Sequence, residues 1–150
     1  MRKLKVYFDM CSLNRPYDDQ AQTRIQQEST SKLLVQSLIV DGHIDFVWSY
    51  MLEYENSKNP FTEKRNAILD FKNFAVEIIK YDRQIVVIAS GLQNTGINIY
   101  DSLHVACAIF SKCNYFITVD DKLLNKQSKD INFINPTVFI DLWLNERSKL

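Results

Sequence analysis

The feature that most constrains this chain is the run of twenty-two residues from Ile99 to Asp120. Its first half has the apolar content of a buried helix opened by Asp101, and Tyr115 to Val119 is typical of a buried strand. Asp120 follows that strand directly. In a parallel α/β sheet, the loops after the carboxyl ends of the strands meet in one crevice, where ligands bind. Both carboxylates are therefore predicted to face such a crevice.

The rest of the chain alternates short strand patterns with helix patterns. Residues 10–19 contain loop and turn residues, and 85–88 has strand propensity, although a helix over 83–93 is the preferred interpretation. Strands are also expected at 4–8, 44–48, 77–80 and 132–134, and helices at about 20–40, 50–57, 62–74, 121–127 and 136–147. This alternation predicts a three-layer α/β/α sandwich with a mainly parallel central sheet.

Composition limits the classes of protein that the chain can represent. With 150 residues it is expected to be one domain, 1–150, with a sizeable core. Eighteen basic residues balance eighteen acidic ones, which argues against a protein that binds nucleic acid by net charge alone. The balance does not argue against an RNA enzyme that binds its substrate through a small, local surface. Three cysteines without a C-x-x-C pair indicate reduced thiols. No apolar run approaches the roughly 20 residues of a membrane span, and the start does not resemble a signal peptide, so a cytoplasmic location is expected.

Four acidic residues occupy positions from which they can converge. Asp9 and Asp120 each follow a hydrophobic strand, Asp101 opens a helix, and Glu55 lies in the helix after the second strand. Carboxylates packed together raise one another's pKa values, and a bound divalent cation removes that penalty. Oxygen-only ligands favour Mg²⁺ or Mn²⁺ over zinc. Such an ion activates water and stabilises phosphoryl charge, so phosphodiester hydrolysis is the reaction that this set suits best.

Four segments, taken in order, resemble PIN-domain ribonucleases, the family that includes the toxins of VapBC-type toxin–antitoxin pairs. The segments are V-Y-F-D at 6–9, the spacing from Ser49 to Glu55, D-S-L-H-V-A-C-A at 101–108 and T-V-D at 118–120. The resemblance implies a parallel sheet flanked by helices, a helix over 83–93, and cleavage of single-stranded RNA with Mg²⁺ or Mn²⁺. It also implies an antitoxin protein and a homodimer as partners. The implied catalytic and metal-binding residues are Asp9, Glu55, Asp101 and Asp120.

The residues after Asp9 depart from the family's pattern. Many members have Thr and Asn there, where this chain has Met10 and Cys11, and Ser12 is the candidate to supply the missing hydroxyl. The departure motivates a second hypothesis, a catalytically weak or inactive PIN-like domain that binds RNA or a protein. Phosphatase chemistry at Asp9 is a third hypothesis, which is disfavoured because dehalogenase-like phosphatases use D-x-D and position 11 is Cys.

Several candidates have a structural interpretation beside the functional one. Single Asp residues commonly cap helices, and Asp121 is interpreted either as an auxiliary ligand or, preferably, as a cap. Glu53 competes with Glu55, but two residues along a helix point about 200° apart, and the spacing from Ser49 favours Glu55. His104 lies on the same helix face as Asp101. It is a candidate base or ligand, although a hydrogen-bonded, partly buried histidine is the preferred interpretation.

Further residues near the predicted crevice are candidates for auxiliary or RNA contacts. Thr118, within T-V-D, is an auxiliary candidate. The candidate RNA phosphate contacts are Asn14, Arg15 and Arg24. That these three are ordinary solvated surface residues is an equally good interpretation. The aromatic residues near enough to the predicted site to stack on a base are Tyr17, Tyr50 and Tyr54.

Overall fold

The computed structural model describes residues 3–18 and 21–148, and these residues contain a five-stranded parallel sheet in the order β3-β2-β1-β4-β5. Every connection between consecutive strands includes a helix, as parallel pairing requires. The strands are β1 (Lys5–Phe8), β2 (Asp45–Ser49), β3 (Glu77–Ile79), β4 (Tyr115–Ile117) and β5 (Asn132–Ile134).

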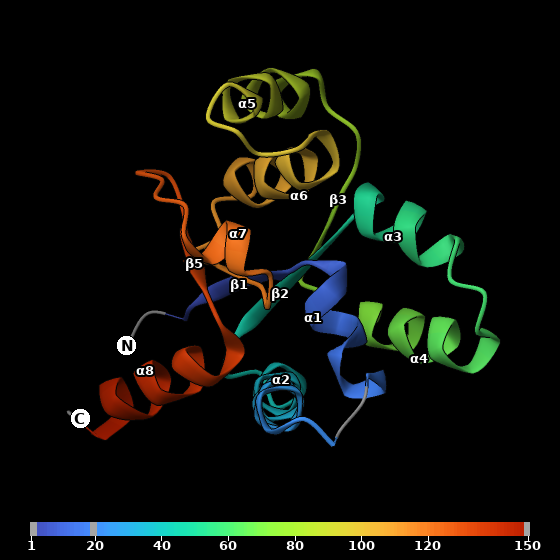
Figure 1. Cartoon of the computed structure of the whole chain (residues 1–150), viewed down its shortest axis with the longest axis vertical. Helices are drawn as coiled ribbons and strands as arrows, with labels where there is room; N and C mark the ends of the chain where they lie inside the picture. The colour runs from blue at the N-terminus through green and yellow to red at the C-terminus, as the bar shows by residue number, and fades with distance from the viewer. Residues whose placement is uncertain (1–2, 19–20, 149–150) are drawn as a thin grey trace.

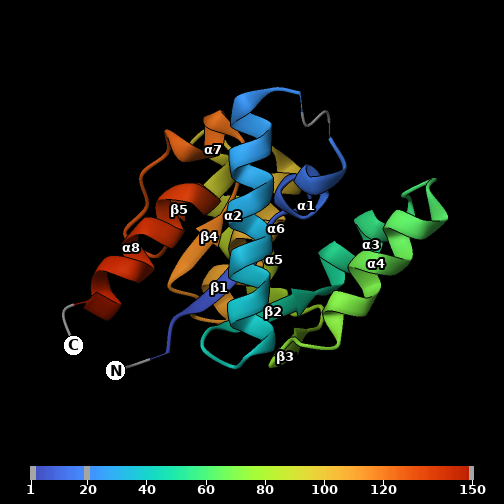
Figure 2. The ribbon, with the colours of Figure 1, turned by 90° about the horizontal axis from the view of Figure 1, so that it is seen from below.

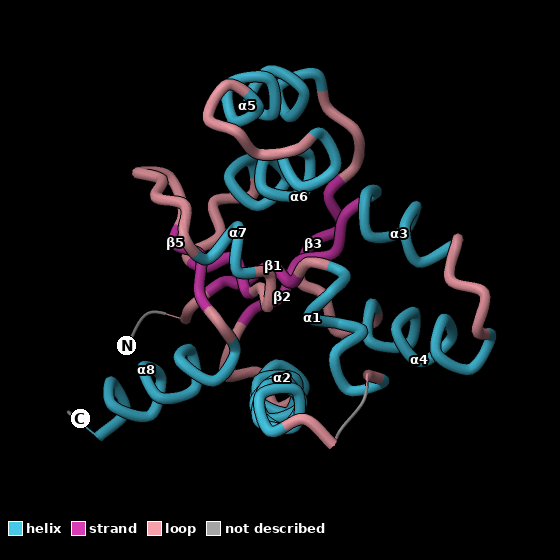
Figure 3. Tube along the Cα trace, viewed as in Figure 1, coloured by secondary structure: helices cyan, strands magenta, loops and turns pink. Residues whose placement is uncertain are grey.

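Helices cover both faces of this sheet. In Figure 1, α5 and α6 lie on one side and α2 and α8 on the other, while α3 and α4 extend outward at the side of β3. Figure 2 shows α2 running across its face with α8 beside it, and Figure 3 shows the strands between the helix layers. The helices are α1 (Met10–Asn14), the 3₁₀ helix η1 (Arg15–Tyr17), α2 (Thr23–Val40), α3 (Tyr50–Ser57), α4 (Thr62–Lys72), α5 (Arg83–Gln93), α6 (Ile99–Phe110), α7 (Asp121–Leu124) and α8 (Pro136–Ser148). The predicted three-layer α/β/α fold is confirmed.

The central strands are apolar because both of their faces are covered. Val6, Tyr7 and Phe8 of β1 have no exposed surface, which explains why this strand has no alternation of polar and apolar residues. Residues 83–93 form helix α5, which is the preferred interpretation of the sequence. Asp82 caps it, and Ile85 and Ala89, one turn apart, are its buried residues. Strand propensity at 85–88 is overridden because this spacing buries one helix face against α6.

Three local expectations were wrong. Residues 10–17 form α1 and η1 rather than a loop, because the Asp9 side chain accepts the Ser12 N–H and starts a helix directly after β1. Asp101 does not open α6. Asn98 caps it by accepting the Asp101 N–H, which leaves Asp101 in the first turn. Helix α7 ends at Leu124 rather than near 127. Residues 19–20, at the predicted start of α2, lie outside the described residues.

A lysine is buried on the inner face of α2. Lys32 is 6 % exposed and lines a hollow of about 110 Å³ together with Leu13, Ile68 and Phe71. Its ammonium donates to Gln36 Oε1 at 2.6 Å and lies 5.4 Å from the ring centroid of Phe71. Burial lowers the pKa of Lys32 from 10.5 to about 8. The charged form of Lys32 therefore lowers the stability of the fold at neutral pH.

No helix in the described residues is both long and apolar enough to span a membrane.

We expect Lys32→Met to raise the free energy of unfolding by about 1–3 kcal/mol at pH 7, because the variant removes a buried charge. The advantage should be complete below pH 8 and shrink between about pH 8 and 10.5, where the folded wild-type protein loses its proton before the unfolded chain does. Urea unfolding at several pH values measures both effects. The exposed control Lys129→Met should change little, and a Lys32→Met advantage that does not depend on pH would contradict the prediction.

Candidate active site

The switch point of the sheet lies between β1 and β4. Strands β2 and β3, which follow β1 in the sequence, lie on one side of β1, and β4 and β5 lie on its other side. Ligands of parallel α/β sheets bind outside the carboxyl ends of the strands at such a point. Phe8 pairs with Ile117 at these ends, and the Asp9 N–H donates to the Ile117 carbonyl at 3.3 Å. Asp9 and the segment from Thr118 to Asp120 therefore leave the sheet side by side.

Asp9 is 5 % exposed and accepts hydrogen bonds on both carboxylate oxygens. Oδ1 accepts the Ser12 N–H and the Cys11 thiol, each at 3.1 Å, and Oδ2 accepts the Thr118 hydroxyl at 2.5 Å. Burial raises the pKa of Asp9, and these donors partly offset the shift. The predicted role of the Ser12 hydroxyl is wrong, because that hydroxyl donates to the Ile117 carbonyl. Thr118, as an auxiliary, and Cys11 supply the side-chain contacts instead.

Cys11, which departs from the family's pattern, contacts Asp9 directly. Although the residue is exposed as a whole, its thiol is turned toward Asp9 and lies 3.7 Å from Thr118 Oγ1. Burial, and after it the charge of Asp9, raises the pKa of the Cys11 thiol well above its usual range. The sulfur therefore keeps its proton and acts as a donor to Asp9 rather than as a nucleophile.

Glu55 is held by a chain of hydrogen bonds that begins in the buried core. Its Oε1 lies 2.6 Å from Nε2 of His104, whose Nδ1 lies 2.6 Å from the Tyr7 hydroxyl. That hydroxyl is 2.7 Å from Ser49 Oγ, which also accepts the Leu52 N–H as the cap of α3. The chain joins β1, α6 and α3 and orients the carboxylate of Glu55. His104 is hydrogen-bonded, as the preferred interpretation expected, but at 2 % exposed it is buried rather than partly buried.

Asp101 lies within electrostatic reach of both Asp120 and Asp9. The pKa of the half-buried Asp101 is raised first by burial and then by the charges of Asp120 and Asp9. Asn98 Nδ2 donates to Asp101 Oδ2 at 2.8 Å. Asp120 is the cap of α7, with its Oδ1 accepting the Lys122 N–H at 2.9 Å, and its own N–H donates to Thr118 Oγ1 at 3.0 Å. Thr118 thus connects Asp9 to Asp120.

The four predicted ligands do not form a closed metal cage. Among the described residues, no group of three or more His, Cys, Asp and Glu residues is arranged closely enough to hold one metal ion. Asp9, Asp101 and Asp120 share one electrostatic field, whereas Glu55 is turned to His104. The donor chemistry fits a hard divalent cation, because it consists of carboxylates whose mutual repulsion a cation relieves.

The alternatives weighed for the neighbouring acids have clear outcomes. Glu53 forms an ion pair with Lys72 at 2.5 Å, whereas Glu55 hydrogen-bonds to His104, so the two carboxylates have different partners, as their positions on the helix predict. Asp121 is not the cap of α7. It is the first residue of α7 and pairs with Arg24 at 2.7 Å, while Asp120 makes the cap.

The predicted RNA contacts have mixed surroundings. Arg15 and Arg24 both pair with the buried Glu28. Arg24 also donates to the Val119 carbonyl at 3.1 Å, so it holds the segment before Asp120. Their contact with RNA stays a prediction. Tyr54 is exposed, whereas Tyr50 is partly buried against Tyr81. The side chain of Tyr17 lies outside the described residues.

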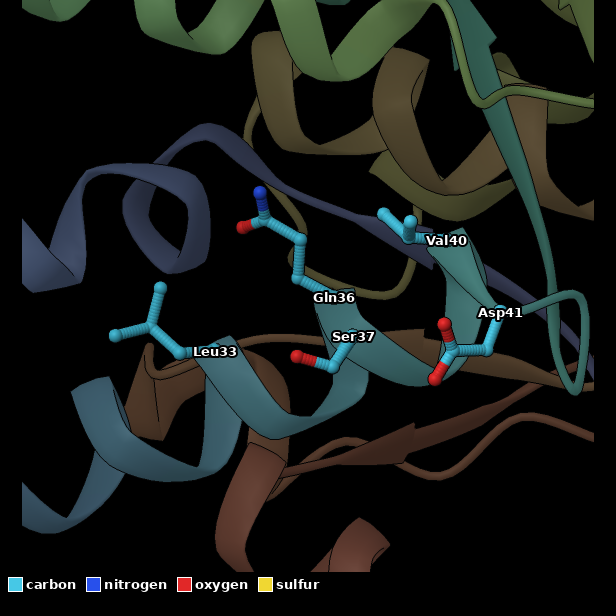
Figure 4. Close-up of a pocket in the computed structure, with 5 residues that line it drawn as sticks. All are labelled: Leu33, Gln36, Ser37, Val40 and Asp41. Atoms are coloured by element: carbon cyan, nitrogen blue, oxygen red, sulfur yellow. The ribbon is translucent and has the colours of Figure 1, made fainter.

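A hollow of about 260 Å³ lies beside Glu55. It is lined by Met10, Asn14, Glu55, Lys58, Asn59, Pro60, Phe61 and Lys64. Another hollow, of about 330 Å³ and shown in Figure 4, lies on α2 between Leu33 and Asp41 and includes none of the predicted site residues. Of these two hollows, the one beside Glu55 includes a predicted site carboxylate.

Tyr7 is the main residue that sequence reasoning missed. Its ring lies in an apolar strand, where the pattern indicates only a core residue, although a buried tyrosine hydroxyl usually requires a partner. That rule signals a polar contact, but it does not identify Ser49 and His104 as the partners, because they come from distant segments.

The comparisons with known proteins give a likeness of fold. No protein-family model matches the chain, and no curated protein matches it. Among solved structures, it is similar to a chain of the crystal structure of VapBC2 from Rickettsia felis, which was determined with a DNA fragment from the VapBC2 promoter bound. The TM-score is 0.57 at 18 % sequence identity, covering 88 % of this chain and 98 % of that chain. The similarity supports the PIN-like architecture, and function rests on the site.

We expect Tyr7→Phe to lower the free energy of unfolding by about 1–3 kcal/mol, because Ser49 and His104 lose a buried hydrogen-bond partner. Denaturant unfolding measures the change. Tyr115→Phe, on the neighbouring strand β4, is the matched control, since Tyr115 is partly exposed and should tolerate the loss of its hydroxyl. Equal stability of Tyr7→Phe and the wild-type protein would show that the chain of hydrogen bonds to Glu55 is not formed.

Proposed function

We propose that this protein is a metal-dependent endoribonuclease that hydrolyses single-stranded RNA, with Mg²⁺ or Mn²⁺ at Asp9, Glu55, Asp101 and Asp120. The observation that supports this most directly is that Asp9 and Asp120 both hydrogen-bond to Thr118 at the switch point of the sheet, where Asp101, from a third segment, is affected by the charges of both. Like charges collected in this way destabilise a fold unless a ligand uses them. The family resemblance of the sequence supports the same assignment.

The residues of the chain have distinct roles in this proposal. Asp9 is oriented by Thr118 and by the Ser12 N–H, and Asp120 is oriented through Thr118 and its own cap. Asp101 is held by Asn98, and Glu55 by His104. Fixed carboxylates bind a small hard cation with little loss of conformational freedom. When bound, such an ion supplies an activated water and stabilises the negative charge of the phosphoryl group.

We further propose that the protein acts in the cytoplasm as the toxin of a toxin–antitoxin pair, with an antitoxin protein as partner. The fold similarity to a chain of VapBC2 supports this, because VapBC-type pairs are those to which the sequence resemblance points. A homodimer belongs to the same proposal. Co-expression with the product of an adjacent small gene, followed by co-purification, tests the partner directly.

A second candidate function is a PIN-like module with a weak or silent site that binds RNA or protein. Two observations favour it. The Cys11 thiol occupies Asp9 Oδ1, and the described acidic residues do not form a closed metal cage. The response to metal separates the two candidates.

Asp9→Asn should lower the rate of RNA cleavage at least about tenfold, equivalent to ~1.4 kcal/mol of transition-state stabilisation. The same variant should melt a few degrees higher than the wild-type protein, because burial disfavours the charged form of Asp9. Cleavage of a labelled single-stranded RNA and thermal melting measure the two effects. Asp70→Asn, on the exposed face of α4, should change neither. Unchanged cleavage by Asp9→Asn would exclude the assignment.

Millimolar Mn²⁺ or Mg²⁺ should raise the melting temperature, since a ligand of the folded state stabilises it by about 1.4 kcal/mol at ten times its Kd. Asp101→Asn should reduce this shift, and EDTA should reverse it and stop cleavage. A wild-type protein without a shift would favour the silent-site candidate.

A further inference from the structure

Two exposed tyrosines stand beside two of the catalytic candidates. Tyr54 precedes Glu55 on α3, and Tyr100 precedes Asp101 on α6. Their exposed fractions are 44 % and 52 %, so neither ring serves the core. Single exposed aromatic residues are common on protein surfaces and require no function. A shared position on two helices that border one site is less common and suggests a joint role.

The two tyrosines form one cluster with a lysine. The Lys58 ammonium lies 4.3 Å from the ring centroid of Tyr54, within cation–π range. The pKa of the Tyr54 hydroxyl is lowered first by Lys58 and to a smaller extent by hydrogen bonding to Tyr100. We call Tyr54, Lys58 and Tyr100 the tyrosine–lysine cluster. It connects α3 to α6 across the edge of the site.

The same chemistry continues into the hollow beside Glu55. Phe61 is 64 % exposed, and the Lys64 ammonium lies 5.5 Å from its ring centroid. Both line the hollow of about 260 Å³ together with Lys58 and Glu55. Glu55 lies on α3 and Lys64 on α4, with Lys58 and Phe61 in the segment between these helices, and both helices extend outward from the sheet in Figure 1 and Figure 2. Aromatic rings and ammonium groups thus alternate along a surface that passes Glu55.

Single-stranded RNA is the polymer whose chemistry matches this surface. Its unpaired bases stack on exposed aromatic rings, and its phosphates pair with ammonium groups. In a duplex the bases are stacked inside the helix and cannot reach the rings. Because the net charge of the protein is zero, a local set of lysines must offset the carboxylates that repel the phosphates.

We propose that the tyrosine–lysine cluster, continued by Phe61 and Lys64, is the surface that binds single-stranded RNA and leads it to the carboxylates. A base stacks on Tyr54 or Tyr100, and Lys58 neutralises an adjacent phosphate. The substrate class rests on the proposed function, but binding by this surface requires neither metal nor cleavage. Binding and cleavage can therefore fail separately.

The test measures binding of a fluorescent twelve-nucleotide single-stranded RNA by anisotropy, in EDTA so that no cleavage occurs. Tyr54→Ala and Tyr100→Ala should each raise Kd about fivefold or more, whereas Tyr54→Phe should retain the wild-type Kd because the ring remains. Lys58→Gln should weaken binding and lower the dependence of log Kd on log salt concentration by about one unit or slightly less. An abasic oligonucleotide should bind Tyr54→Ala and the wild-type protein equally.

Two matched controls separate this surface from general effects. Phe74→Ala removes a ring of similar exposure, 46 %, just beyond α4, and Lys129→Gln removes an exposed charge just before β5. Both should bind as the wild-type protein does. Circular dichroism confirms that each variant is folded.

The outcomes decide the inference independently of the enzyme assignment. RNA binding that depends on Tyr54 and Tyr100, without cleavage in Mn²⁺, supports the inference and contradicts the proposed nuclease. Cleavage by the wild-type protein with an unchanged Kd in folded Tyr54→Ala and Tyr100→Ala overturns the inference alone. Equal weakening by Phe74→Ala also overturns it, as does equal affinity for a duplex of the same length.

Discussion

The site depends on the parallel pairing of β1 between β2 and β4. This pairing fixes the register of Phe8 against Ile117, and the Asp9 N–H extends it by one further hydrogen bond. Asp9 is thereby held beside Thr118, and Tyr7 is held where it reaches both Ser49 and His104. A one-residue shift of β1 would turn Tyr7 to the other face and separate these contacts. The order of the central strands thus determines which side chains share the site.

The carboxylates are placed against the ordinary preferences of a folded chain. Asp9 is buried, and the pKa of Asp101 is raised first by burial and then by the charges of Asp120 and Asp9. Neutral donors surround Asp9, since Thr118, Ser12 and Cys11 all hydrogen-bond to it without a positive charge. The repulsion is therefore reduced but not cancelled. Local conflicts of this kind are expected where function, rather than stability, selects the residues.

Much of the fold could be predicted because strand and helix patterns are local. The apolar runs at 4–8 and 115–119 and the alternation with helices were sufficient for a parallel three-layer sheet. Capping was less predictable, because it depends on which of several polar residues turns toward the backbone. Asn98 rather than Asp101 caps α6, Asp120 rather than Asp121 caps α7, and Asp9 begins a helix where loop residues suggested a turn.

The sequence by itself determined the identity and order of the acidic residues and the elements that end near them, because these depend on local patterns and on the family resemblance. Only the tertiary structure decided their partners. Glu55 is held by His104, which Tyr7 holds in turn, and Asp9 is held by Cys11 and Thr118. These contacts join residues that are distant along the chain, and their distances follow from the packing of whole elements. No spacing in the sequence specifies that packing.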